Sequence, residues 1–371
     1  MINGRVRVLH IVLDLDAGGL ERLVTEIVRH IDRDRFESHV LVLQFPGRTA
    51  GALGDAAELH VAPPLPVWSL LWPAPLTREI RRISPDVVHT HSGVWFKGSL
   101  AARRAGVPRV IHTDHGRRHP DPWIGRALEW LASRRTDVVV AVSETLARHL
   151  AETIVGRSRR IAVVVNGVDT NRFRPRPDPG ALRRELNLAP DTPIIGSIGR
   201  LDYVKGYDLM LEAFARLATE WRGAQRPALA LVGDGPEEER LQGQARALGL
   251  GGQAFFMGWR DPVDDLLAGF TLYTLASRSE GTSIGLLEAM SAGCCPVVTD
   301  VGGNRHVLGP ELAHRLVPPG DPMALAGAWR EALADPARRR EDAQVARARV
   351  REVFAVDAMV RRYEALYTEG S

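Results

Sequence analysis

Runs of apolar, β-branched residues of strand length alternate with longer amphipathic stretches in the first half of the chain. The strand-like runs lie at residues 6–13, 38–44, 86–92, 109–115, 137–143 and 161–167. The amphipathic stretches lie at residues 19–31, 75–83, 98–106 and 123–134. Because the apolar runs are continuous rather than alternating, they are typical of strands buried on both faces. The pattern predicts a parallel sheet covered by helices.

The same alternation restarts after residues 166–180, a segment with three prolines and two glycines that suits a linker. The later strand-like runs lie at residues 193–200, 228–235, 253–258, 270–277, 295–300 and 314–319. The later amphipathic stretches lie at residues 207–221, 237–249 and 282–293. Two such arrays predict an α/β protein with two doubly wound, Rossmann-like domains that face each other. We place these domains at residues 1–180 and 181–352.

Composition narrows the kind of protein. The chain has 371 residues, of which 45% are hydrophobic, enough for two cores of ordinary size. No run reaches the roughly 18 apolar residues of a membrane span, and the N-terminus lacks the pattern of a secretory signal. The only cysteines, Cys294 and Cys295, are adjacent and cannot join distant segments. We therefore expect a soluble protein of a reducing, cytoplasmic compartment.

Charge is distributed unevenly along the chain. Residues 1–180 contain 26 Lys and Arg against 19 Asp and Glu, whereas the remainder has 22 against 26. A basic first half suits an acidic or lipid-phosphate acceptor, or peripheral contact with the inner face of an anionic membrane; solvated Arg-rich helices are the alternative. The apolar segment 63–76, with Trp68 and Trp72, is either a membrane-contacting loop or lid, or a partly buried connection. The dispersed arginines carry no nucleic-acid recognition pattern.

The densest site signal is SRSEGTSIGLLEAMSAG, residues 277–293. Glu280 and Gly281 follow a predicted strand, and an apolar helix opens at Thr282 or Ser283, so this is the edge of the sheet where ligands bind. Gly281 allows close backbone approach, and the helix start offers amides to a phosphate. Glu288, inside the apolar helix, needs a partner such as a ribose diol. The alternative is that Glu280 caps the helix and Glu288 reaches solvent.

A second signal is SIGRLDYVKG, residues 197–206. Gly199 lets Arg200 turn into the crevice after a strand, and Lys205 precedes Gly206 and a new helix. One Arg and one Lys on such a loop suit a pyrophosphate and can stabilise a diphosphate leaving group in place of a metal ion. Two ordinary surface cations are the alternative.

The first half carries weaker signals. Gly18 and Gly19, between the first strand and the first helix, allow backbone amides near a phosphate or sugar. Three histidines cluster around Asp114, namely His112, His115 and His119. They lack the motifs of a metal site, so a histidine that hydrogen-bonds a sugar hydroxyl is favoured over a metal ligand. His89 and His91 either line the same cleft or pack in the core.

Taken together, these segments resemble glycosyltransferase family four, the retaining enzymes of the GT-B fold. The match runs in order through AGGLE, PDVVHTHSG, IHTDHG, DVVVAVSE, NGVDTNRFRP, GRLDYVKG, LVGDGPEEERL, EGTSIGLLEAMSAG and VVTDVGGN to MVRRYEALY. The resemblance implies two Rossmann-like domains around a central cleft, with a C-terminal helix in residues 353–371 that packs back on the first domain.

The resemblance also implies roles for the site residues. Arg200 and Lys205 grip the donor diphosphate, and Glu288 binds the nucleoside ribose. Glu280 contacts the donor sugar, with the amides of Ser283 and Ile284 near the phosphates.

His115 looks like the histidine that touches the transferred sugar near the reaction centre; His112 is the competing candidate. Where many members read EGFG, this chain has Thr282 and Ser283, which leaves the contacts to the donor sugar open.

From the resemblance we expect a retaining, metal-independent transfer of a sugar from a UDP- or GDP-sugar, with no cofactor, to a glycan or lipid-linked acceptor in bacterial surface polysaccharide or glycolipid synthesis. A front-face path, in which the leaving phosphate deprotonates the acceptor, explains the absence of a carboxylate nucleophile and base pair. The alternatives are a sugar-nucleotide epimerase or hydrolase of the same fold, and a non-catalytic sugar-nucleotide-binding component of a polysaccharide assembly complex. No GxGxxG motif supports an NAD-dependent oxidoreductase.

Overall fold

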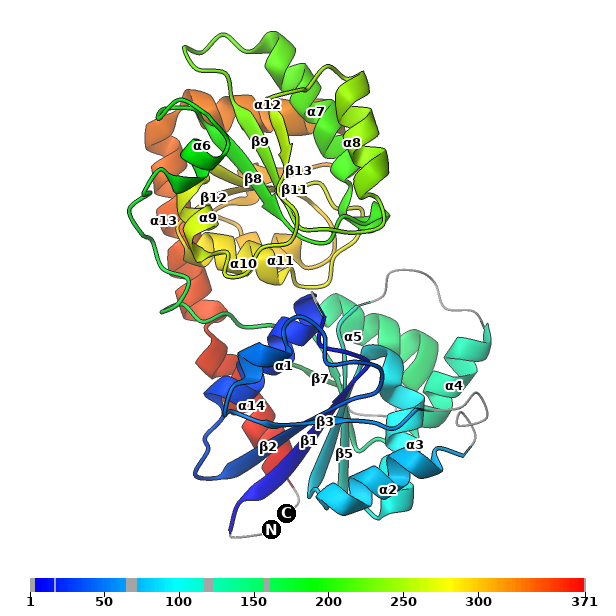
Figure 1. Cartoon of the computed structure of the whole chain (residues 1–371). Coiled ribbons are helices and arrows are strands. Elements are labelled where there is room, and N and C mark those ends of the chain that lie inside the picture. Colours follow the sequence, from blue (N-terminus) through cyan, green and yellow to red (C-terminus); the bar gives the residue numbers. More distant parts are fainter. Residues whose placement is uncertain (1–3, 17, 65–71, 117–122, 157–160, 370–371) are drawn as a thin grey trace. The chain divides into compact units, whose positions relative to one another are not determined.

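The computed structural model describes residues 4–16, 18–64, 72–116, 123–156 and 161–369. The chain divides into two compact units (Figure 1): unit 1 comprises Met1–Gly167 and Val356–Ser371, and unit 2 comprises Val168–Ala355. Each unit contains one parallel sheet, so the predicted pair of doubly wound α/β domains is confirmed. None of the described helices is both long and apolar enough to cross a membrane.

The sheet of unit 1 has seven strands in the order β3-β2-β1-β4-β5-β6-β7. They are β1 (Val6–Val12), β2 (Phe36–Val42), β3 (Glu58–Val61), β4 (Val87–His91), β5 (Arg109–Asp114), β6 (Val138–Ala141) and β7 (Ile161–Val163). The helices are α1 (Gly19–His30), α2 (Ala74–Ile83), α3 (Trp95–Ala105), α4 (Trp123–Ser133), α5 (Glu144–Leu150) and α14 (Val356–Thr368). Short helical turns are η1 (Ala50–Leu53), η3 (Ser92–Val94) and η4 (Ala151–Val155).

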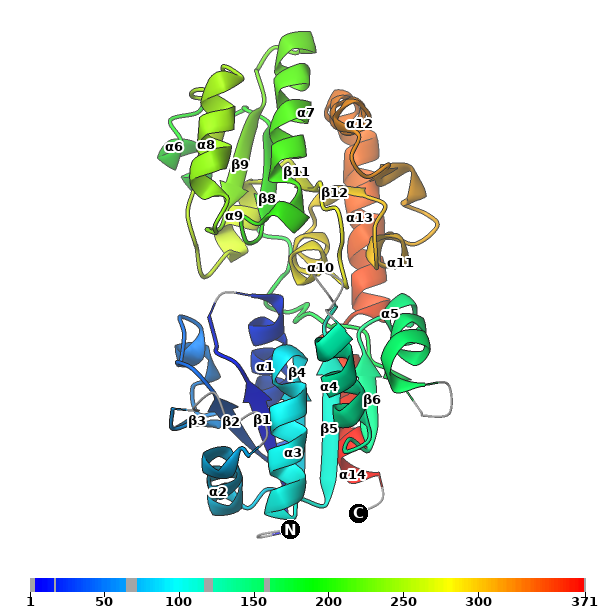
Figure 2. The same ribbon diagram turned by 90° about the vertical axis from the view of Figure 1, so that its right-hand side faces the viewer.

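Alternation along β1 separates two cores. Leu9 and Ile11 pack in one buried cluster with residues of α2 and α3, which lie side by side in Figure 2. Val12 belongs to a second buried cluster with residues of α1. Helix α14 contacts α1 and β1, so the C-terminal segment packs on the same face of the sheet as α1.

The sheet of unit 2 has six strands in the order β10-β9-β8-β11-β12-β13. They are β8 (Ile194–Ile198), β9 (Ala228–Val232), β10 (Ala254–Phe256), β11 (Leu272–Leu275), β12 (Cys295–Thr299) and β13 (Leu316–Val317). The helices are α6 (Ala181–Glu185), α7 (Tyr207–Glu220), α8 (Glu238–Ala247), α9 (Asp264–Gly269), α10 (Ile284–Ser291), α11 (Asn304–Leu308), α12 (Pro322–Ala334) and α13 (Pro336–Val353), with the turns η5 (Tyr203–Lys205) and η6 (Ala313–Arg315).

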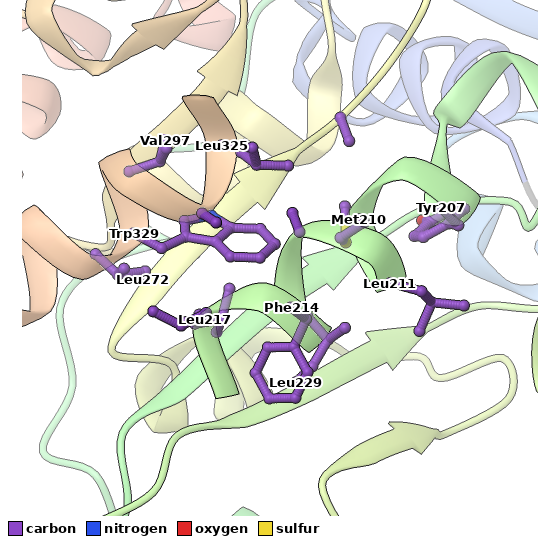
Figure 3. Packing of buried hydrophobic residues seen from close by; sticks show 14 of the residues in the cluster. Tyr207, Met210, Leu211, Phe214, Leu217, Leu229, Leu272, Val297, Leu325 and Trp329 are labelled. Carbon is purple, nitrogen blue, oxygen red and sulfur yellow. The ribbon is translucent and has the colours of Figure 1, made fainter. Parts of the chain in front are cut away.

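The main core of unit 2 lies between its sheet and helices α7 and α12. Figure 3 shows Phe214 and Leu217 of α7 gathered with Trp329 of α12 and apolar side chains of the strands. Trp329 is fully buried, and its indole Nε1 donates a hydrogen bond to Thr274 Oγ1 at 3.0 Å. This bond satisfies the one polar atom of the ring, so Trp329 fills the core without an unpaired donor.

Two details differ from the sequence prediction. The boundary between the units falls after Gly167 rather than at residue 180, because residues 168–180 pack on unit 2: Phe173 is buried and its carbonyl accepts a hydrogen bond from Ser291 Oγ at 2.5 Å. Strand β3 was not predicted, since Glu58–Val61 is short and alternates polar with apolar residues at the edge of the sheet. The apolar segment 65–71, with Trp68, lies outside the described residues.

The buried cluster of unit 2 predicts a steep cost for truncating its largest side chains. We expect Phe214→Ala to lower the free energy of unfolding by about 3–5 kcal/mol, because a fully buried ring is lost and a cavity remains. Urea denaturation measures this change. The control is Met323→Ala on α12, whose side chain is 65% exposed and whose loss should cost no more than about 0.5 kcal/mol. Equal effects of the two variants would contradict the assigned core.

Candidate active site

The strand order of unit 2 marks one place where a ligand crevice is expected. From β8 the chain runs to β9 and β10 on one side of the sheet and then returns to β11 on the other side. In open parallel sheets, ligands bind outside the carboxyl ends of the two strands where this reversal occurs. Those ends carry the loops of residues 199–206 and 276–283, which hold the two strongest sequence signals.

An ion pair joins these two loops. Lys205 Nζ lies 2.8 Å and 3.0 Å from the two carboxylate oxygens of Glu280, and Ser277 Oγ donates to Glu280 Oε1 at 2.6 Å. The Glu280 side chain is only 6% exposed and that of Lys205 is 27% exposed. A carboxylate this buried is stable only when its oxygens are bonded, so Lys205 and Ser277 together fix its position.

Local backbone geometry explains why Lys205 reaches Glu280. The Asp202 carboxylate caps the turn η5 by accepting from the Val204 amide at 3.3 Å, and Gly206 follows in a left-handed conformation with φ of +66°. A Cβ at Gly206 would lie 2.1 Å from the carbonyl oxygen of Ala276, so only glycine allows the two loops to approach this closely.

A second ion pair braces the same loops. The Arg278 guanidinium forms two hydrogen bonds with the Asp208 carboxylate at 2.7 Å and 2.8 Å and stacks over Tyr203 at 4.2 Å. The Arg278 amide also donates to the Val204 carbonyl at 2.8 Å. Burial by itself would raise the pKa of Asp208, but the bidentate pairing with Arg278 outweighs it and lowers this pKa. The Lys205 loop is thus held in place independently of Glu280.

Gly302 and Gly303 pack closely against the backbone of Glu280 and Gly281. The Gly303 amide donates to the Gly281 carbonyl at 2.8 Å. Gly302 has φ of +53°, and a Cβ there would lie 1.7 Å from the carbonyl oxygen of Glu280. The VGGN sequence at residues 301–304 is therefore required for the close packing that positions Glu280 and Gly281.

Helix α10 begins directly after this segment. Its N-cap is Ser283, whose Oγ accepts a hydrogen bond from the Leu286 amide at 3.4 Å. Ile284 is the first helical residue, and Thr282 and Ser283 are both buried. The first amides of α10 and the positive end of its dipole thus lie next to Gly281 in the chain. Ser283, and not Glu280, caps the helix.

Glu288 lies inside α10 and is 3% exposed. It therefore does not reach solvent, which removes one of the two interpretations left open by the sequence. Its charge acts on the buried phenol of Tyr273, whose pKa is raised well above 10 by burial and by neighbouring groups that include Tyr207 and Glu288. Tyr273 OH donates to the Ile198 carbonyl at 3.2 Å at the end of β8, so Glu288 belongs to the same strand end as the other predicted residues.

Arg200 follows β8 and is exposed. It lies five residues before Lys205 on the same loop, and its guanidinium takes no part in the Lys205–Glu280 ion pair. The described structure thus brings Lys205, Glu280 and the start of α10 together and leaves Arg200 at the surface of this loop.

In unit 1 the corresponding reversal of strand order falls between β1 and β4. A chain of histidines begins there: His10 Nδ1 lies 3.2 Å from His91 Nε2, and His91 Nδ1 lies 3.1 Å from His115 Nε2. His115 is partly buried, whereas His10 and His91 are fully buried. The orientation of the His115 ring therefore depends on a buried neighbour.

Helix α14 contributes to this network through its tyrosines. His89 Nδ1 lies 2.8 Å from Tyr367 OH, and His89 Nε2 lies 2.7 Å from Thr113 Oγ1, which in turn lies 3.3 Å from Tyr363 OH. Both ring nitrogens of the buried His89 are therefore bonded. His89 packs in the core rather than lining a cleft.

The other predicted residues of unit 1 have different surroundings. His112 is buried and stacks on Trp95 with the ring centroids 4.0 Å apart, and its Nδ1 bonds to Thr90 Oγ1 at 3.0 Å. This packing ties His112 to the core and leaves His115 as the partly exposed member of the pair. Asp114 accepts from the Gly116 amide at 2.9 Å, and His119 lies outside the described residues.

The glycine pair stands at the start of the first helix. Gly18 is the N-cap of α1 with an extended backbone, and Gly19 is its first residue. A Cβ at Gly18 would approach the flexible carboxylate of Glu21. The position is compatible with the predicted backbone contact to a ligand.

Sequence reasoning did not single out Ser277 and His10. Ser277 directly precedes the Arg-Ser-Glu segment, and its role depends on a rotamer that only the fold reveals. His10 is a lone polar residue within an apolar strand, a signal that a buried network exists.

Two family models match the chain. The description "Glycosyltransferase Family 4" matches residues 17–172, and "Glycosyl transferases group 1" matches residues 180–349. A D-inositol 3-phosphate glycosyltransferase of Geodermatophilus obscurus is 30% identical over 406 residues, covering 96% of this chain and 86% of that protein. A GDP-mannose-dependent α-(1-6)-phosphatidylinositol monomannoside mannosyltransferase of Mycolicibacterium smegmatis is 30% identical over 292 residues, covering 73% and 74%.

Among solved structures, Anabaena HepE in complex with UDP and glucose superposes with a TM-score of 0.85 at 22% identity, covering 98% of this chain and 100% of that chain. The fold is thus that of the GT-B glycosyltransferases. This chain belongs to the glycosyltransferase family described as group 1 and family 4.

The histidine network makes unit 1 sensitive to acid. Burial lowers the pKa of His10 to about 3 and that of His115 to about 4, and it lowers the pKa values of His89 and His91 well below 6.5. The unfolded chain therefore binds more protons than the native one below about pH 6.5. Stability rises with pH in this window, by up to about 1.4 kcal/mol per pH unit for each histidine.

We expect the free energy of unfolding to fall steeply between pH 7 and pH 5, as measured by urea denaturation. His10→Asn should reduce this pH dependence by about one proton. The exposed Met323 provides the control, because Met323→Ala removes no titratable group and should leave the slope unchanged. A wild-type stability that does not vary over this range would contradict the buried neutral histidines.

Proposed function

We propose that the enzyme transfers a sugar from a UDP- or GDP-sugar to a glycan or lipid-linked acceptor, with retention of anomeric configuration and without a metal ion. The observation that carries this proposal is the Lys205–Glu280 ion pair at the carboxyl ends of β8 and β11, beside the start of α10. It places a cation and a buried carboxylate next to a helix N-terminus, at the expected crevice of a doubly wound sheet.

In this proposal, the diphosphate of the donor lies against Lys205, Arg200 and the amides around the start of α10. Lys205 is a compact point charge, and Arg200 adds planar forked donors. Gly281 and Thr282 lead into the helix, where Ser283 and Ile284 offer their amides. Positive charge in this position stabilises a departing diphosphate, the role that a metal ion serves in other transferases.

The two carboxylates have separate tasks. Glu280 is fixed by Ser277 and, in the free protein, also by Lys205; in the donor complex it accepts hydrogen bonds from hydroxyls of the transferred sugar. Glu288, buried in α10, accepts from the ribose hydroxyls of the nucleoside. Because both proposed roles are to bind hydroxyl groups, we assign neither to covalent catalysis.

The proposed transfer step retains the anomeric configuration. The bond from the anomeric carbon to the diphosphate oxygen breaks as the acceptor oxygen bonds to the same face of that carbon. The acceptor proton passes to the leaving diphosphate. His115, neutral because burial lowers its pKa to about 4, hydrogen-bonds the transferred sugar, and Gly18 and Gly19 approach the ligand through their backbone.

The names of two relatives support the proposed class of donor. The Escherichia coli relative, 25% identical over 319 residues, is named a UDP-Gal:α-D-GlcNAc-diphosphoundecaprenol α-1,3-galactosyltransferase. The Mycolicibacterium relative is named as GDP-mannose-dependent. Both names contain a lipid-linked acceptor, which supports a place in bacterial polysaccharide or glycolipid synthesis.

The basic surface of unit 1 supports work at the cytoplasmic face of an anionic membrane. A pocket of about 400 Å³ between α2 and α3 is lined by Trp72, Ala74, Thr77, Arg78, Arg81 and Arg104. Trp72 is 57% exposed, and the Arg104 guanidinium lies 4.0 Å from its ring centroid. An exposed indole beside arginines suits the interface of an anionic bilayer.

Nucleotide binding and turnover test the donor site. A thermal-shift panel of nucleoside diphosphates and their sugars should reveal one base that stabilises the protein. With that donor, we expect Lys205→Met to lower kcat/KM by about 100- to 1,000-fold, because a cation at the leaving group is lost. Chelation of divalent metals should leave kcat unchanged.

The control for this variant is Arg330→Met, which removes an exposed ion pair with Glu220 between α12 and α7 and should keep wild-type kinetics. Rapid epimerisation or hydrolysis of the donor without any acceptor would replace the transferase by the epimerase or hydrolase alternative. Binding without any turnover across an acceptor panel would favour a non-catalytic role.

Co-sedimentation with liposomes tests the membrane contact. We expect binding to vesicles with phosphatidylglycerol and little binding to pure phosphatidylcholine, with an affinity that falls as salt rises. The double variant Arg78→Glu/Arg81→Glu should abolish binding, whereas the exposed Arg305→Glu in unit 2 should not. Equal binding of both variants would remove this support.

A further inference from the structure

Two Glu-x-His sequences face each other at the edge of the unit 1 sheet. Glu37 and His39 lie on β2, and Glu58 and His60 lie on the edge strand β3. Residues two apart in a strand point to the same face, and the parallel register pairs His39 directly with Glu58. Two carboxylates and two imidazoles therefore gather on one face of two neighbouring strands.

Donor atoms of three residues lie close together, with Glu58 taking part through both of its carboxylate oxygens. His39 Nδ1 lies 3.0 Å from His60 Nε2 and 3.5 Å from Glu58 Oε2, and His60 Nε2 lies 3.7 Å from Glu58 Oε1. Ligands of a tetrahedral zinc ion, at about 2.0–2.2 Å from the metal, are about 3.3–3.5 Å apart. The three separations bracket this value, so a small movement of side chains would complete the coordination.

We propose that His39, Glu58 and His60 form a binding site for a divalent transition metal, with water as the fourth ligand. Zinc is the ion that this ligand set suits best. Two imidazoles and one carboxylate are a ligand set that zinc accepts. The site fastens the four-residue edge strand β3 to β2. Its role is structural, and it is independent of the proposed sugar transfer.

The Glu37 carboxylate lies beside His39 and orients its imidazole as a metal ligand requires. His39 Nε2 lies 3.1 Å from Glu37 Oε1, and Glu37 in turn accepts from Arg7 Nη2 at 3.3 Å. A ligating histidine commonly donates its other ring N–H to a carboxylate in this way, which fixes its tautomer. The Nδ1 lone pair of His39, which accepts from His60 Nε2 without the metal, is then the one that binds the ion. The side chains of His39 and His60 are buried, whereas Glu58 is 66% exposed and leaves the fourth position open to water.

Arg82 competes with the metal, because it holds His60 in the tautomer whose Nε2 carries the proton. Its Nη2 lies 3.1 Å from His60 Nδ1, and because arginine only donates, that nitrogen accepts and Nε2 carries the proton toward His39. Metal binding moves the His60 proton from Nε2 to Nδ1 and displaces Arg82. The Arg82 side chain is 62% exposed and already pairs with Glu79, so it can leave at little cost.

Another histidine group in the described residues fits a metal less well. His10, His89 and His91 also bring ring nitrogens together. Both nitrogens of His89 are bonded to hydroxyls, however, and both nitrogens of His91 are bonded to other histidines. This group therefore serves as the matched control site.

Titration of the metal-free full-length protein with Co²⁺ and then Zn²⁺ tests the proposal. We expect one Co²⁺ per chain with the strong visible absorption of tetrahedral coordination, and its displacement by Zn²⁺. At about one hundred times its Kd, Zn²⁺ should raise the unfolding temperature of unit 1 by about 5 °C. Absence of stoichiometric binding would overturn the proposal.

Variants locate the ion. Glu58→Gln and His60→Gln should lower Zn²⁺ affinity at least tenfold, and Glu58→Gln, at an exposed position, should fold normally without metal. Glu37→Gln should lower affinity about 10- to 100-fold, and Arg82→Gln should raise it because the competing donor is gone. His91→Asn should leave the Zn²⁺ affinity unchanged.

Binding that is lost in His91→Asn but kept in Glu58→Gln would place the ion in the other histidine group and overturn the proposal. Because Glu58 lies outside the proposed donor site, Glu58→Gln should keep the wild-type rate of sugar transfer. This outcome separates failure of the metal site from failure of the proposed function.

Discussion

Burial of both faces of two parallel sheets is the constraint on which the rest of the structure depends. Strands such as β9 and β12 are buried at every residue, so polar side chains can work only where the strands end. In each unit, the order of strands reverses once, and the strand ends on either side of the reversal diverge. The Lys205–Glu280 pair and the His10–His91–His115 chain each lie at such a reversal.

The fold could be read from the sequence because continuous apolar runs and amphipathic stretches alternate with little ambiguity. The prediction missed β3, whose polar alternation does not resemble a buried strand, and it placed the boundary of the units thirteen residues late, at 180 rather than 167. Both misses arise from tertiary packing. The buried contact of Phe173 with Ser291 draws the Pro-rich segment onto unit 2, and no local pattern indicates this contact.

The candidate site was predicted less completely. The sequence indicated Lys205 and Glu280 separately, as groups that both meet a ligand, whereas in the structure they bond to each other. Ser277 and the backbone of Gly302 complete the setting of Glu280, and their importance depends on distances across loops that are far apart in sequence. For the histidines, the stacking of His112 on Trp95 distinguishes it from His115, a distinction that the sequence leaves open.

In the proposed function, a nucleoside diphosphate takes over the Lys205 ammonium that Glu280 holds in the free protein. A double-mutant cycle with Lys205→Met and Glu280→Gln, measured as free energies of unfolding with and without the preferred nucleoside diphosphate, tests it most directly. We predict a coupling energy of about 1–3 kcal/mol in the free protein that falls markedly when the nucleotide is bound. A coupling energy that is the same in both states, with nucleotide affinity unchanged in Lys205→Met, would contradict the account.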